Sequence, residues 1–558
     1  MTPSEFRSPG STREGAAPPS PEASAAGAPA PQADAPAAAE IELKVLADPA
    51  DLARLMGAPP VLAHARNKGR VRHLTSVYYD TEEGALERAG VVFRVRNVGR
   101  RFVATVKRKL GAGGNPLLRE EWEAPTAGMA PDPSPLLPLL PADLRVLLTD
   151  APLRPAFTTT VRRHTQRLVL PDAALEIAFD QGYIEAGERK APISEIELEL
   201  KQGRPSALYE LALGLAETAP LRPSLASKAE RGNALARDRL LPGRRAPRLA
   251  LSAALSLDDA LSAILRSIFT HLLANQEAAE DGRDPEGVHQ MRVALRRLRA
   301  ALAQIRPLAA SPALEALRAD ARWLASSFSA ARNWDVFLLD LLPAVQSACP
   351  ALGGFPELAE ALGERRAAAY AAAHEALAAA RVGRFELALG LWIEQRGWHA
   401  GALSETLEML AAPALAFACP LLARRHRKVM KAGRHFARLT PEARHLLRLA
   451  VKKLRYSGDF FLPLEPGGKS ARRYVRRLSR LQDLLGTYND MMVTAERPVE
   501  LAGCSLSPAA EAALGAVVGW QARGLLQIEA DLRTAWRDFH RTEPPWSAWL
   551  TAAGAPPA

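Results

Sequence analysis

The chain has 558 residues, enough for two or more domains that each bury a core of their own. Apolar residues make up 48% and charged residues 24%, the proportions of an ordinary globular protein. The formal net charge of +11 favours polyanionic partners, namely nucleic acid, phosphorylated metabolites or an anionic membrane surface, without choosing among them. The three cysteines are far apart and form no CxxC pair, which argues against a disulfide framework or a thiolate zinc site and indicates a reducing compartment.

No stretch of the sequence is typical of a membrane span or of a secretory signal. The most apolar run, Leu410 to Ala423, is short and contains Pro413 and Pro420, so it indicates a buried core segment. The N-terminus lacks a basic region followed by an apolar run. We therefore expect a cytoplasmic protein without a membrane partner.

Residues 1–39 are mostly Ala, Pro, Ser and Gly, with almost no large apolar groups. Such a segment cannot bury enough surface to offset its ordering entropy, so we predict a disordered tail. Residues 546–558 are predicted to be a second tail.

From residue 40 to about 240, short runs of period-two alternation separated by turn signals predict a strand-rich α+β domain. In the first run, Glu40 to Lys44, two carboxylates and a lysine share one strand face. The pattern returns in the run from Ser194 to Lys201, which places three more carboxylates on one face. Further strand-like runs lie between these two: Val91–Asn97, Phe102–Lys109, Leu118–Glu123, Phe157–Leu170 and Leu175–Asp180. The first two carry Arg or Lys at the same two-residue spacing, as in Arg94 and Arg96 or Lys107 and Lys109. A turn at residues 111–115, a loop and short helix over 129–148, and a helix at 209–216 are also predicted.

The charged faces of these strands have two explanations. A single charged strand face is usually just solvated. Five or six such strands instead indicate a barrel whose polar residues point inward to a common lumen. The acidic pairs on the first and last strands would neutralise the arginines and lysines between them only in part. A divalent cation together with a bound phosphate anion would balance the charges that remain.

Eight short motifs follow one another along this domain. They are Glu40-x-Glu42-x-Lys44, Tyr79-Asp80-Thr81, Arg94-x-Arg96, Thr105-x-Lys107, Arg119-x-Glu121-x-Glu123, Asp180-x-Gly182, Glu195-x-Glu197-x-Glu199 and Ser227-Lys228-x-x-Arg231-Gly232. In this order they resemble the CYTH superfamily, the triphosphate tunnel metalloenzymes, over about residues 40–236. The resemblance implies an antiparallel eight-stranded tunnel barrel that hydrolyses triphosphates with Mg²⁺ or Mn²⁺.

The expected site divides into acidic and basic groups. The metal ligands are expected to be Glu40, Glu42, Glu195 and Glu197, helped by Asp180 and Glu199. The residues expected to bind phosphate oxygens and stabilise transition-state charge are Lys44, Arg94, Arg96, Lys107, Arg119, Arg163 and Lys228. Arg162 remains the alternative to Arg163, because adjacent strand residues face opposite ways. Glu121 and Glu123 are expected to hold the basic groups in place, share a second metal or orient water.

A basic linker punctuated by Pro and Gly is predicted at residues 241–254, followed by an all-α helical-bundle domain at 255–545. This domain contains an internal repeat, since residues 289–299 match residues 445–455 position for position. At about 100° per residue, offsets 0, 3, 7 and 10 fall on one helix face. The two predicted stripes are His289, Arg292, Arg296 and Arg299, and His445, Arg448, Lys452 and Arg455.

Two such stripes call for an outside anion, because like charges one turn apart repel. The alternative is a pair of unrelated, solvated basic faces. The repeat, together with Arg332-Asn333-Trp334-Asp335 and the run Leu481 to Asp490, resembles the CHAD domain, the conserved-histidine α-helical domain. The family usually has Arg-Asp-x-Asp at this motif. This chain has Asn333 in place of the first Asp and keeps Arg332 and Asp335. The resemblance implies two four-helix repeats around a basic cavity that binds inorganic polyphosphate, with Arg332 among the binding residues.

The expected function is therefore a metal-dependent inorganic triphosphatase with an appended polyphosphate-binding domain, and association with polyphosphate granules is a further expectation. Two alternatives stay open. The same tunnel could act on an organic triphosphate, by hydrolysis of thiamine or nucleoside triphosphates or by adenylyl cyclisation. The chain could instead be a non-catalytic polyphosphate-granule or scaffold protein. No aromatic-interleaved RNA-binding motif is present, so nucleic acid is not an expected partner.

Overall fold

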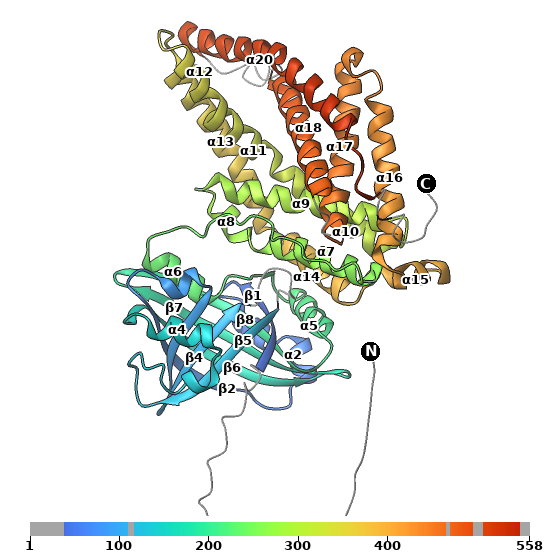
Figure 1. Cartoon of the computed structure of the whole chain (residues 1–558). Coiled ribbons are helices and arrows are strands. Elements are labelled where there is room, and N and C mark those ends of the chain that lie inside the picture. The colour runs from blue at the N-terminus through green and yellow to red at the C-terminus, as the bar shows by residue number, and fades with distance from the viewer. Residues whose placement is uncertain (1–37, 110–116, 465–468, 495–505, 547–548, 550–558) are drawn as a thin grey trace, which may run out of the picture. The chain divides into compact units, whose positions relative to one another are not determined.

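The computed structural model describes residues 38–109, 117–464, 469–494, 506–546 and 549. The predicted tail at 1–39 lies outside the described residues, except that Ala38 and Ala39 begin the first strand. The predicted turn at 111–115 and nearly all of the predicted tail at 546–558 also lie outside them. Figure 1 shows strands in the blue-to-green part of the chain and helices in the green-to-red part.

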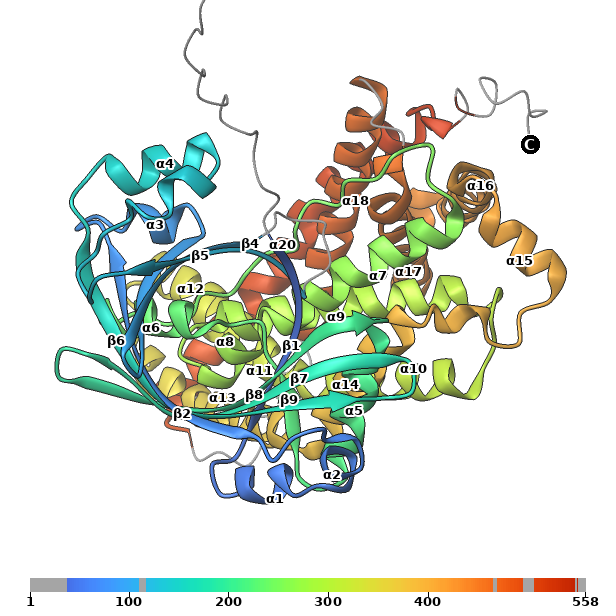
Figure 2. The ribbon, with the colours of Figure 1, turned by 90° about the horizontal axis from the view of Figure 1, so that it is seen from below.

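Nine strands form one antiparallel sheet. They are β1 (Ala38–Ala47), β2 (Arg70–Asp80), β3 (Val91–Val98), β4 (Arg101–Lys109), β5 (Leu118–Thr126), β6 (Arg154–Val169), β7 (Ala173–Ala186), β8 (Arg189–Gly203) and β9 (Leu221–Pro223). Their order is β5-β4-β3-β2-β6-β7-β8-β1-β9, and β1 also pairs with β5. The first eight strands therefore close on one another, and they curve into a ring in Figure 2. The expected antiparallel eight-stranded tunnel is confirmed, with the three-residue β9 as an addition.

Apolar side chains cover the outside of this ring rather than its inside. On β1 and β8, the outward Leu43, Val45, Ile196 and Leu198 are buried in the same core as helix α5 (Ser206–Ala216). Since successive strand residues face opposite ways, burying this apolar set outside turns the alternating charged set into the lumen. The tunnel is therefore a sheet with its polar face enclosed.

A second apolar cluster covers β3, β4 and β5. Phe93, Val106 and Trp122 pack with Leu144 and Leu148 of helix α4 (Ala142–Thr149). The loop and helix predicted over residues 129–148 thus serve as the outer cover of these strands. The other short helices of this region are α1 (Leu52–Met56), α2 (Pro59–His64), α3 (Ala85–Arg88), the 3₁₀ turn η1 (Leu137–Leu139) and α6 (Lys228–Ala236).

The strand register sets charged residues of opposite sign against each other. Lys44 lies opposite Glu197 between β1 and β8, and Lys107 lies opposite Glu121 between β4 and β5. Opposite charges at paired positions stabilise a sheet, whereas like charges weaken it. The register therefore brings acidic and basic groups from distant parts of the sequence to one wall.

Helices make up the rest of the described chain, as predicted. They are α7 (Leu257–Leu273), α8 (Gln276–Asp281), α9 (Pro285–Ile305), α10 (Pro312–Ser327), α11 (Ser329–Asp335), the π-helical η2 (Val336–Leu341), α12 (Leu342–Ala348), α13 (Phe355–Ala378), α14 (Ala380–Glu394), the 3₁₀ turn η3 (Gly397–His399), α15 (Ser404–Ala411), α16 (Ala414–Ala432), the 3₁₀ turn η4 (Phe436–Arg438), α17 (Pro441–Phe461), the 3₁₀ turn η5 (Leu462–Leu464), α18 (Lys469–Thr494) and α20 (Pro508–His540). Among the helices that the structure describes, none combines the length and apolarity needed to cross a lipid bilayer.

The internal repeat coincides with two helices of the same design. Both α9 and α17 have 21 residues and begin with a proline that follows a side-chain cap, Asp284 and Thr440 respectively. Proline at the first helical position fixes a suitable φ and lacks only an N–H that the helix would leave unpaired. His289 and His445 are consequently the fifth residues of their helices, in equivalent places.

Candidate active site in the tunnel and basic cluster in the helical domain

The lumen of the tunnel contains a cavity of about 650 Å³. Twelve of the residues that the sequence predicted for the site line this cavity: Glu40, Glu42, Lys44, Arg94, Arg96, Lys107, Glu121, Glu123, Arg163, Glu197, Glu199 and Lys228. Asp180 and Glu195 lie beneath its surface, fully buried, and contact Lys228. Arg119 belongs to β5, where its backbone pairs with Glu40, and its side chain lies outside the described residues.

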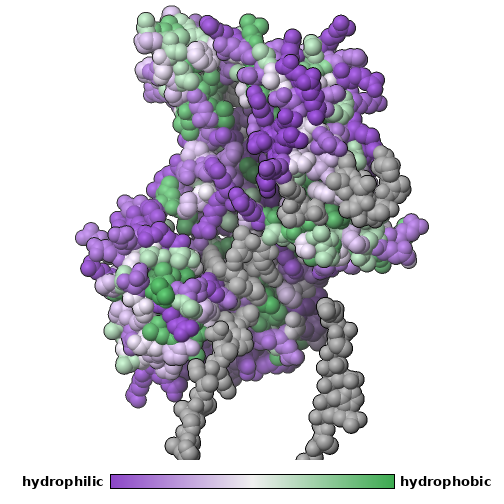
Figure 3. Space-filling model, in the orientation of Figure 1, coloured by the Kyte–Doolittle hydropathy of each residue, from purple (hydrophilic) through white to green (hydrophobic). Residues whose placement is uncertain are grey.

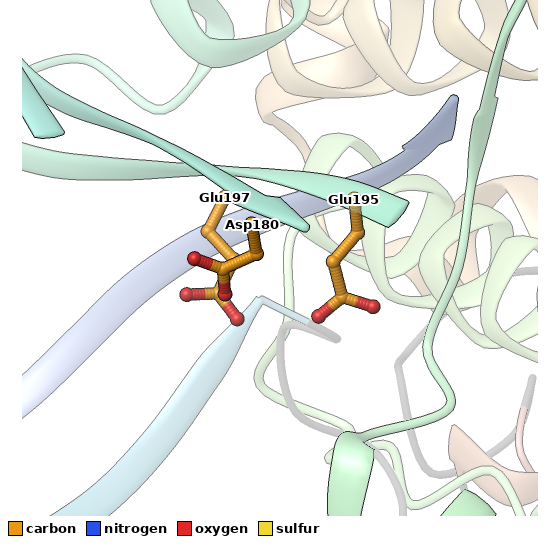
Figure 4. A group of neighbouring side chains, drawn as sticks. All are labelled: Asp180, Glu195 and Glu197. Atoms are coloured by element: carbon orange, nitrogen blue, oxygen red, sulfur yellow. The ribbon is translucent and has the colours of Figure 1, made fainter. Parts of the chain in front are cut away.

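The floor of the cavity is built from three carboxylates around a lysine. Asp180 on β7 and Glu195 and Glu197 on β8 point the same way and bring their oxygens within 4.8 Å of one another (Figure 4). The Lys228 Nζ atom lies 2.7 Å from Asp180 Oδ2, 2.5 Å from Glu195 Oε1 and 2.7 Å from Glu197 Oε1. Burial alone would lower the pKa of Lys228, but the three carboxylates outweigh it and raise that pKa. The lysine is therefore charged.

Helix α6 positions Lys228 in the lumen, because a capping box fixes the N-terminus of the helix. The Ser227 hydroxyl accepts a hydrogen bond from the Glu230 N–H, and the Glu230 side chain accepts one from the Ser227 N–H. Lys228 is the first residue of the helix and is thus held at the lumen. Gly232, one turn later, packs against Phe157, since an added Cβ would lie only 2.1 Å from that ring.

Arg163 holds the acidic floor from the β6 side. Its guanidinium donates to both oxygens of Asp180, at 2.7 and 2.6 Å, and also contacts Glu197. Burial would raise the pKa of Glu197, but Arg163 and Lys228 outweigh it and lower that pKa well below its usual range. The neighbouring Arg162 is exposed. The sequence left open whether Arg162 or Arg163 faces the lumen, and in the structure it is Arg163.

A second acidic group lies on β1 and β5, of which β1 is the neighbour of β8 in the sheet. Glu40 and Glu121 share a hydrogen bond, and Lys107 Nζ lies 2.6 Å from Glu121 and 3.5 Å from Glu40. Burial and the neighbouring Glu121 raise the pKa of Glu40 to about 8, although Lys107 opposes the shift. Glu121 stays ionised, since Lys107 overcomes its burial and brings its pKa down to about 2. The two carboxyl groups thus share Lys107, and Glu121 also contacts Arg94.

Two arginines and a tyrosine form the remaining wall. Arg94 Nη2 lies 3.4 Å from Glu121, and Arg96 Nε donates to Ser76 at 3.1 Å. Burial, Arg94 and Arg163 together lower the pKa of Arg96 to about 10. The buried Tyr78 hydrogen-bonds Arg94, and although burial raises its pKa, the two arginines bring the net value below normal. This wall carries more positive charge than its own neighbours neutralise.

The acidic residues fit a hard divalent cation by their chemistry, because carboxylate oxygens are the donors such ions prefer. Glu40, whose pKa is raised chiefly by burial and then by its hydrogen bond with Glu121, adds a second pair of neighbouring carboxyl groups. One feature differs from the expected ligand set. The carboxylates within ligand distance of one another are Asp180, Glu195 and Glu197, and Lys228 already lies among them. Glu40 faces Glu121 and Lys107 instead.

Several lumen residues were not predicted. Tyr78 and Ser76 come from β2, a strand that the sequence did not reveal apart from its end at Tyr79 and Asp80. Arg231 contacts Glu195 at 3.2 Å. It belongs to a motif quoted for the resemblance, which was the available signal for it. The mouth of the cavity adds residues that no pattern marked: Glu87, Arg88, Arg108, Arg239 and Arg244.

In the helical domain, the predicted stripe on α9 meets a cation from α11. The pKa of His289 is lowered by burial and then by Arg332, with Arg296 and Arg292 adding to the shift. Burial, Arg296 and Arg332 bring the pKa of Arg292 down to about 10. His289, Arg292, Arg296 and Arg332 therefore act on one another electrostatically.

The stripe on α17 joins the same cluster. Burial comes first, and then Arg448 and Arg296 help bring the pKa of Lys452 down to about 8. Arg448 has a partial partner in Asp490 of α18, 3.9 Å away. Among the described residues, the buried Nε atoms of Arg292, Arg296 and Arg448 have no hydrogen-bond partner. We call the six residues His289, Arg292, Arg296, Arg332, Arg448 and Lys452 the basic cluster.

The other predicted stripe residues lie at its margins. Arg299 is exposed and next to Arg322, Arg455 pairs with Asp459 at 3.3 Å, and His445 Nδ1 lies 3.1 Å from Asn489 Oδ1. Hydrophilic side chains also gather over α18, whose sequence is rich in arginine (Figure 3). Asp335, from the motif around Arg332, is fully buried and accepts hydrogen bonds from Arg366 and Tyr370.

Comparison with known proteins gives two family matches and several relatives. The CYTH domain model matches residues 38–232, and the CHAD domain model matches residues 263–497. An inorganic triphosphatase of Haemophilus influenzae is 30% identical over 197 residues, which are 35% of this chain and 54% of that protein. The chain thus spans about half the length of that relative.

Two solved structures are also similar. The crystal structure of the CHAD domain from the plant Ricinus communis is 32% identical, with a TM-score of 0.47, and the likeness covers 54% of this chain and 98% of that one. PptA from Streptomyces chartreusis is 18% identical, with a TM-score of 0.38, over 51% of this chain and 100% of that one. The chain consists of a CYTH domain followed by a CHAD domain.

Proposed function

We propose that the protein is a divalent-metal-dependent inorganic triphosphatase whose helical domain binds inorganic polyphosphate. The observation that carries the proposal is the composition of the lumen. Carboxylates and cations from seven strands and two helices line a single cavity, in which burial, Arg94 and Arg163 lower the pKa of Arg96. An ordinary solvated face would direct these groups outward. The name of the Haemophilus influenzae relative supports the same substrate class.

The metal would be held by carboxylates of β1 and β8. The proposed ligands are Glu40, Glu42, Glu195 and Glu197, with Asp180 and Glu199 in support. When bound, Mg²⁺ or Mn²⁺ would supply positive charge at the phosphoryl oxygens and lower the pKa of bound water. Lys228 would have to share the carboxylates of the floor with it.

The basic residues of the lumen would bind the triphosphate itself. Guanidinium groups donate pairs of hydrogen bonds that match phosphoryl oxygens, and in an enclosed cavity such contacts are strong. The proposed set is Lys44, Arg94, Arg96, Lys107, Arg119, Arg163 and Lys228. Their role is to hold the chain of phosphates in one orientation and to stabilise the charge that grows on the transferred phosphoryl group. Glu121, through Lys107 and Arg94, and Glu123, through Thr105, orient this wall.

The helical domain would bind polyphosphate through neighbouring cations, of which Arg292, Arg296 and Arg448 each have a buried Nε atom without a hydrogen-bond partner among the described residues. Its binding residues are proposed to be the basic cluster with the margin residues Arg299, His445 and Arg455. Repulsion within the cluster is relieved when a polyanion binds, which supports this ligand class. Two polyanion sites on one chain would also raise the effective concentration of substrate near the tunnel and direct the protein to polyphosphate granules.

The enzymatic half of the proposal is tested by phosphate release. The purified chain is incubated with tripolyphosphate, ATP or thiamine triphosphate, with and without Mg²⁺ or Mn²⁺. We expect tripolyphosphate to be hydrolysed fastest and only with metal, and Glu42→Gln to lower kcat at least 100-fold. Glu185→Gln is the matched control, because Glu185 lies at the end of β7 and pairs only with the exposed Lys190 among the described residues. Faster hydrolysis of an organic triphosphate would reassign the substrate, and no hydrolysis of any of the three would refute the enzyme.

The binding half is tested by competition. Labelled long-chain polyphosphate is bound to the full chain, and unlabelled DNA, RNA or polyphosphate is added at equal phosphate concentration. We expect polyphosphate to compete at least tenfold better than either nucleic acid. Equal competition by all three would mean that the helical domain binds polyanions without preference.

A further inference from the structure

The tunnel contains a second cavity that the expected site does not explain. It has a volume of about 250 Å³ and is lined chiefly by arginines: Arg70, Arg72, Arg96, Arg163 and Arg167, together with the single carboxylate Glu176. We call it the far chamber. Arg96, Arg163 and Glu176 line both this chamber and the main cavity, so the two are neighbouring parts of one lumen.

The strand register explains how the far chamber arises. Arg72 and Leu74 lie on the same face of β2 as Tyr78, which lines the main cavity. Arg72 is paired with Arg163, and Arg167 with Glu176. The lumen therefore continues along β2, β6 and β7 beyond the acidic floor, with arginine in place of the carboxylates.

The charge of the far chamber is unbalanced. Of its five guanidinium groups, that of Arg163 is already paired with Asp180 and Glu197, which leaves four facing the one carboxylate of the lining, whereas the main cavity mixes both signs. Arg70, Arg72 and Arg167 are exposed to solvent. In the part of the chain that the structure describes, no carboxylate lies within 4.0 Å of the charged groups of Arg70, Arg72 or Arg167. Arg72 lies opposite Arg163, and a like-charge pair of this kind weakens a sheet unless it is neutralised. Asp180 and Glu197 neutralise Arg163, so Arg72 is the member of the pair that has no carboxylate beside it among the described residues.

These features select the chemistry of a ligand. A single carboxylate cannot hold a divalent cation, so the chamber is suited to an anion bound without metal. Converging guanidinium groups match the tetrahedral oxygens of a phosphoryl group better than they match a halide or a single carboxylate. The chamber shares Arg96, Arg163 and Glu176 with the cavity in which the triphosphate is proposed to lie, so a ligand in the chamber would lie next to that triphosphate.

We propose that the far chamber is a second phosphoryl subsite, occupied either by the end of a linear polyphosphate longer than three units or by free orthophosphate. This inference rests on the proposed function for its substrate class. It extends that function from one triphosphate to a longer phosphate chain or to a product held past the acidic floor.

The test uses the full chain and the double variant Arg70→Gln/Arg72→Gln, with Arg162→Gln as the matched control, because Arg162 is an exposed arginine on the outer face of β6. Orthophosphate binding is measured by calorimetry without metal or substrate, and the ratio of KM for linear hexapolyphosphate to KM for tripolyphosphate is measured with Mg²⁺. A loss of orthophosphate binding by about tenfold in the double variant alone supports free orthophosphate as the occupant. A rise of the KM ratio by about tenfold supports the chain end.

Two further readouts keep the inference open to refutation. Arg167→Gln removes the chamber's charge from another strand, so its effect is measured if the double variant does not fold by circular dichroism. If neither variant differs from Arg162→Gln in orthophosphate affinity or in the KM ratio, the subsite is refuted. A chain that hydrolyses nothing but still loses orthophosphate affinity in the variants would refute the proposed triphosphatase and leave the subsite standing.

Discussion

Arg162 and Arg163 show how strongly one position along a strand changes the surroundings of a side chain. Arg163 contacts Asp180 and Glu197 inside the lumen, whereas Arg162 is exposed on the outer face of β6. The two residues have the same charge and the same backbone conformation, so they form a natural matched pair. Any difference between their variants reports the lumen alone.

We expect Arg163→Ala to lower kcat for tripolyphosphate by about 100-fold, because removing one positioned donor from an enclosed site typically costs that much. Arg162→Ala is expected to stay within about twofold of the parent. Phosphate release is measured at saturating substrate and metal, after circular dichroism has shown that both variants are folded. Equal losses in the two variants would mean that surface charge, and not the lumen, governs the rate.

At the same scale, alternation in the sequence predicts which residues face the lumen but not which of them meet. The pattern places Glu40, Glu195 and Glu197 on inward faces, and all three are found at the cavity or beneath it. The alternation pattern contains no information on how the strands tilt and close into a barrel. That geometry places Glu40 near Lys107 and Glu121, and Asp180 near Glu195 and Glu197. Such partners depend on the register of strands far apart in sequence, which local patterns do not encode.

Among the elements, α9 and α17 carry charges that work against the stability of the fold. Arg296 on α9 lies near Arg292 and Arg332, and it also contributes to the lowered pKa of Lys452 on α17. Its buried Nε atom has no hydrogen-bond partner among the described residues. The arginines around Arg296 therefore lower the stability of the folded protein, which is common at ligand-binding sites.

We expect Arg296→Gln to raise the free energy of unfolding by a few tenths to about 1 kcal/mol, because it removes like-charge repulsion and a buried charge. The same change is expected to weaken polyphosphate binding by about tenfold. Urea unfolding and polyphosphate titration of the full chain measure the two effects. Arg318→Gln on α10 is the control, since Arg318 pairs with Glu315 and lies outside the basic cluster. A variant that is less stable and still binds normally would assign Arg296 to the structure alone.

The elements also differ in how well the sequence predicts them. The match between residues 289–299 and 445–455 predicted two equivalent helical stretches, and these lie in α9 and α17. In contrast, β2 was missed, since its lumen face runs Arg70, Arg72, Leu74, Ser76, Tyr78 and its outer face also mixes polar and apolar residues. A strand without a consistent polar face has no period-two signal. The position of β2 is known only from the structure, in which it lies between β3 and β6.

For the molecule as a whole, the contact between β9 and α14 joins the sheet to the helices. Gly383 on α14 permits it, because an added Cβ would lie 1.8 Å from the Leu221 carbonyl oxygen. Next to this contact, Glu386 is fully buried beside Arg222 and Gln276. Burial raises its pKa to about 8, although Arg222 of β9 and Gln276 of α8 oppose the shift. The carboxyl is thus neutral in the folded protein at neutral pH.

This buried carboxyl makes stability fall as pH rises. In the unfolded chain Glu386 loses its proton near pH 4.5, whereas in the folded chain it keeps the proton to about pH 8. Between these values the folded state binds one more proton, so the free energy of unfolding decreases with increasing pH and levels off above about pH 8. Glu386→Gln removes the titration, so its melting temperature should match the parent near pH 5 and exceed it by several degrees at pH 8. The change in the free energy of unfolding between the two pH values is at most about 4 kcal/mol.

The melting temperatures of the parent and of Glu386→Gln are measured at pH 5 and at pH 8. Glu375→Gln, on the exposed face of α13, is the control. An offset that is the same at pH 5 and pH 8 would show that Glu386 does not titrate in this range.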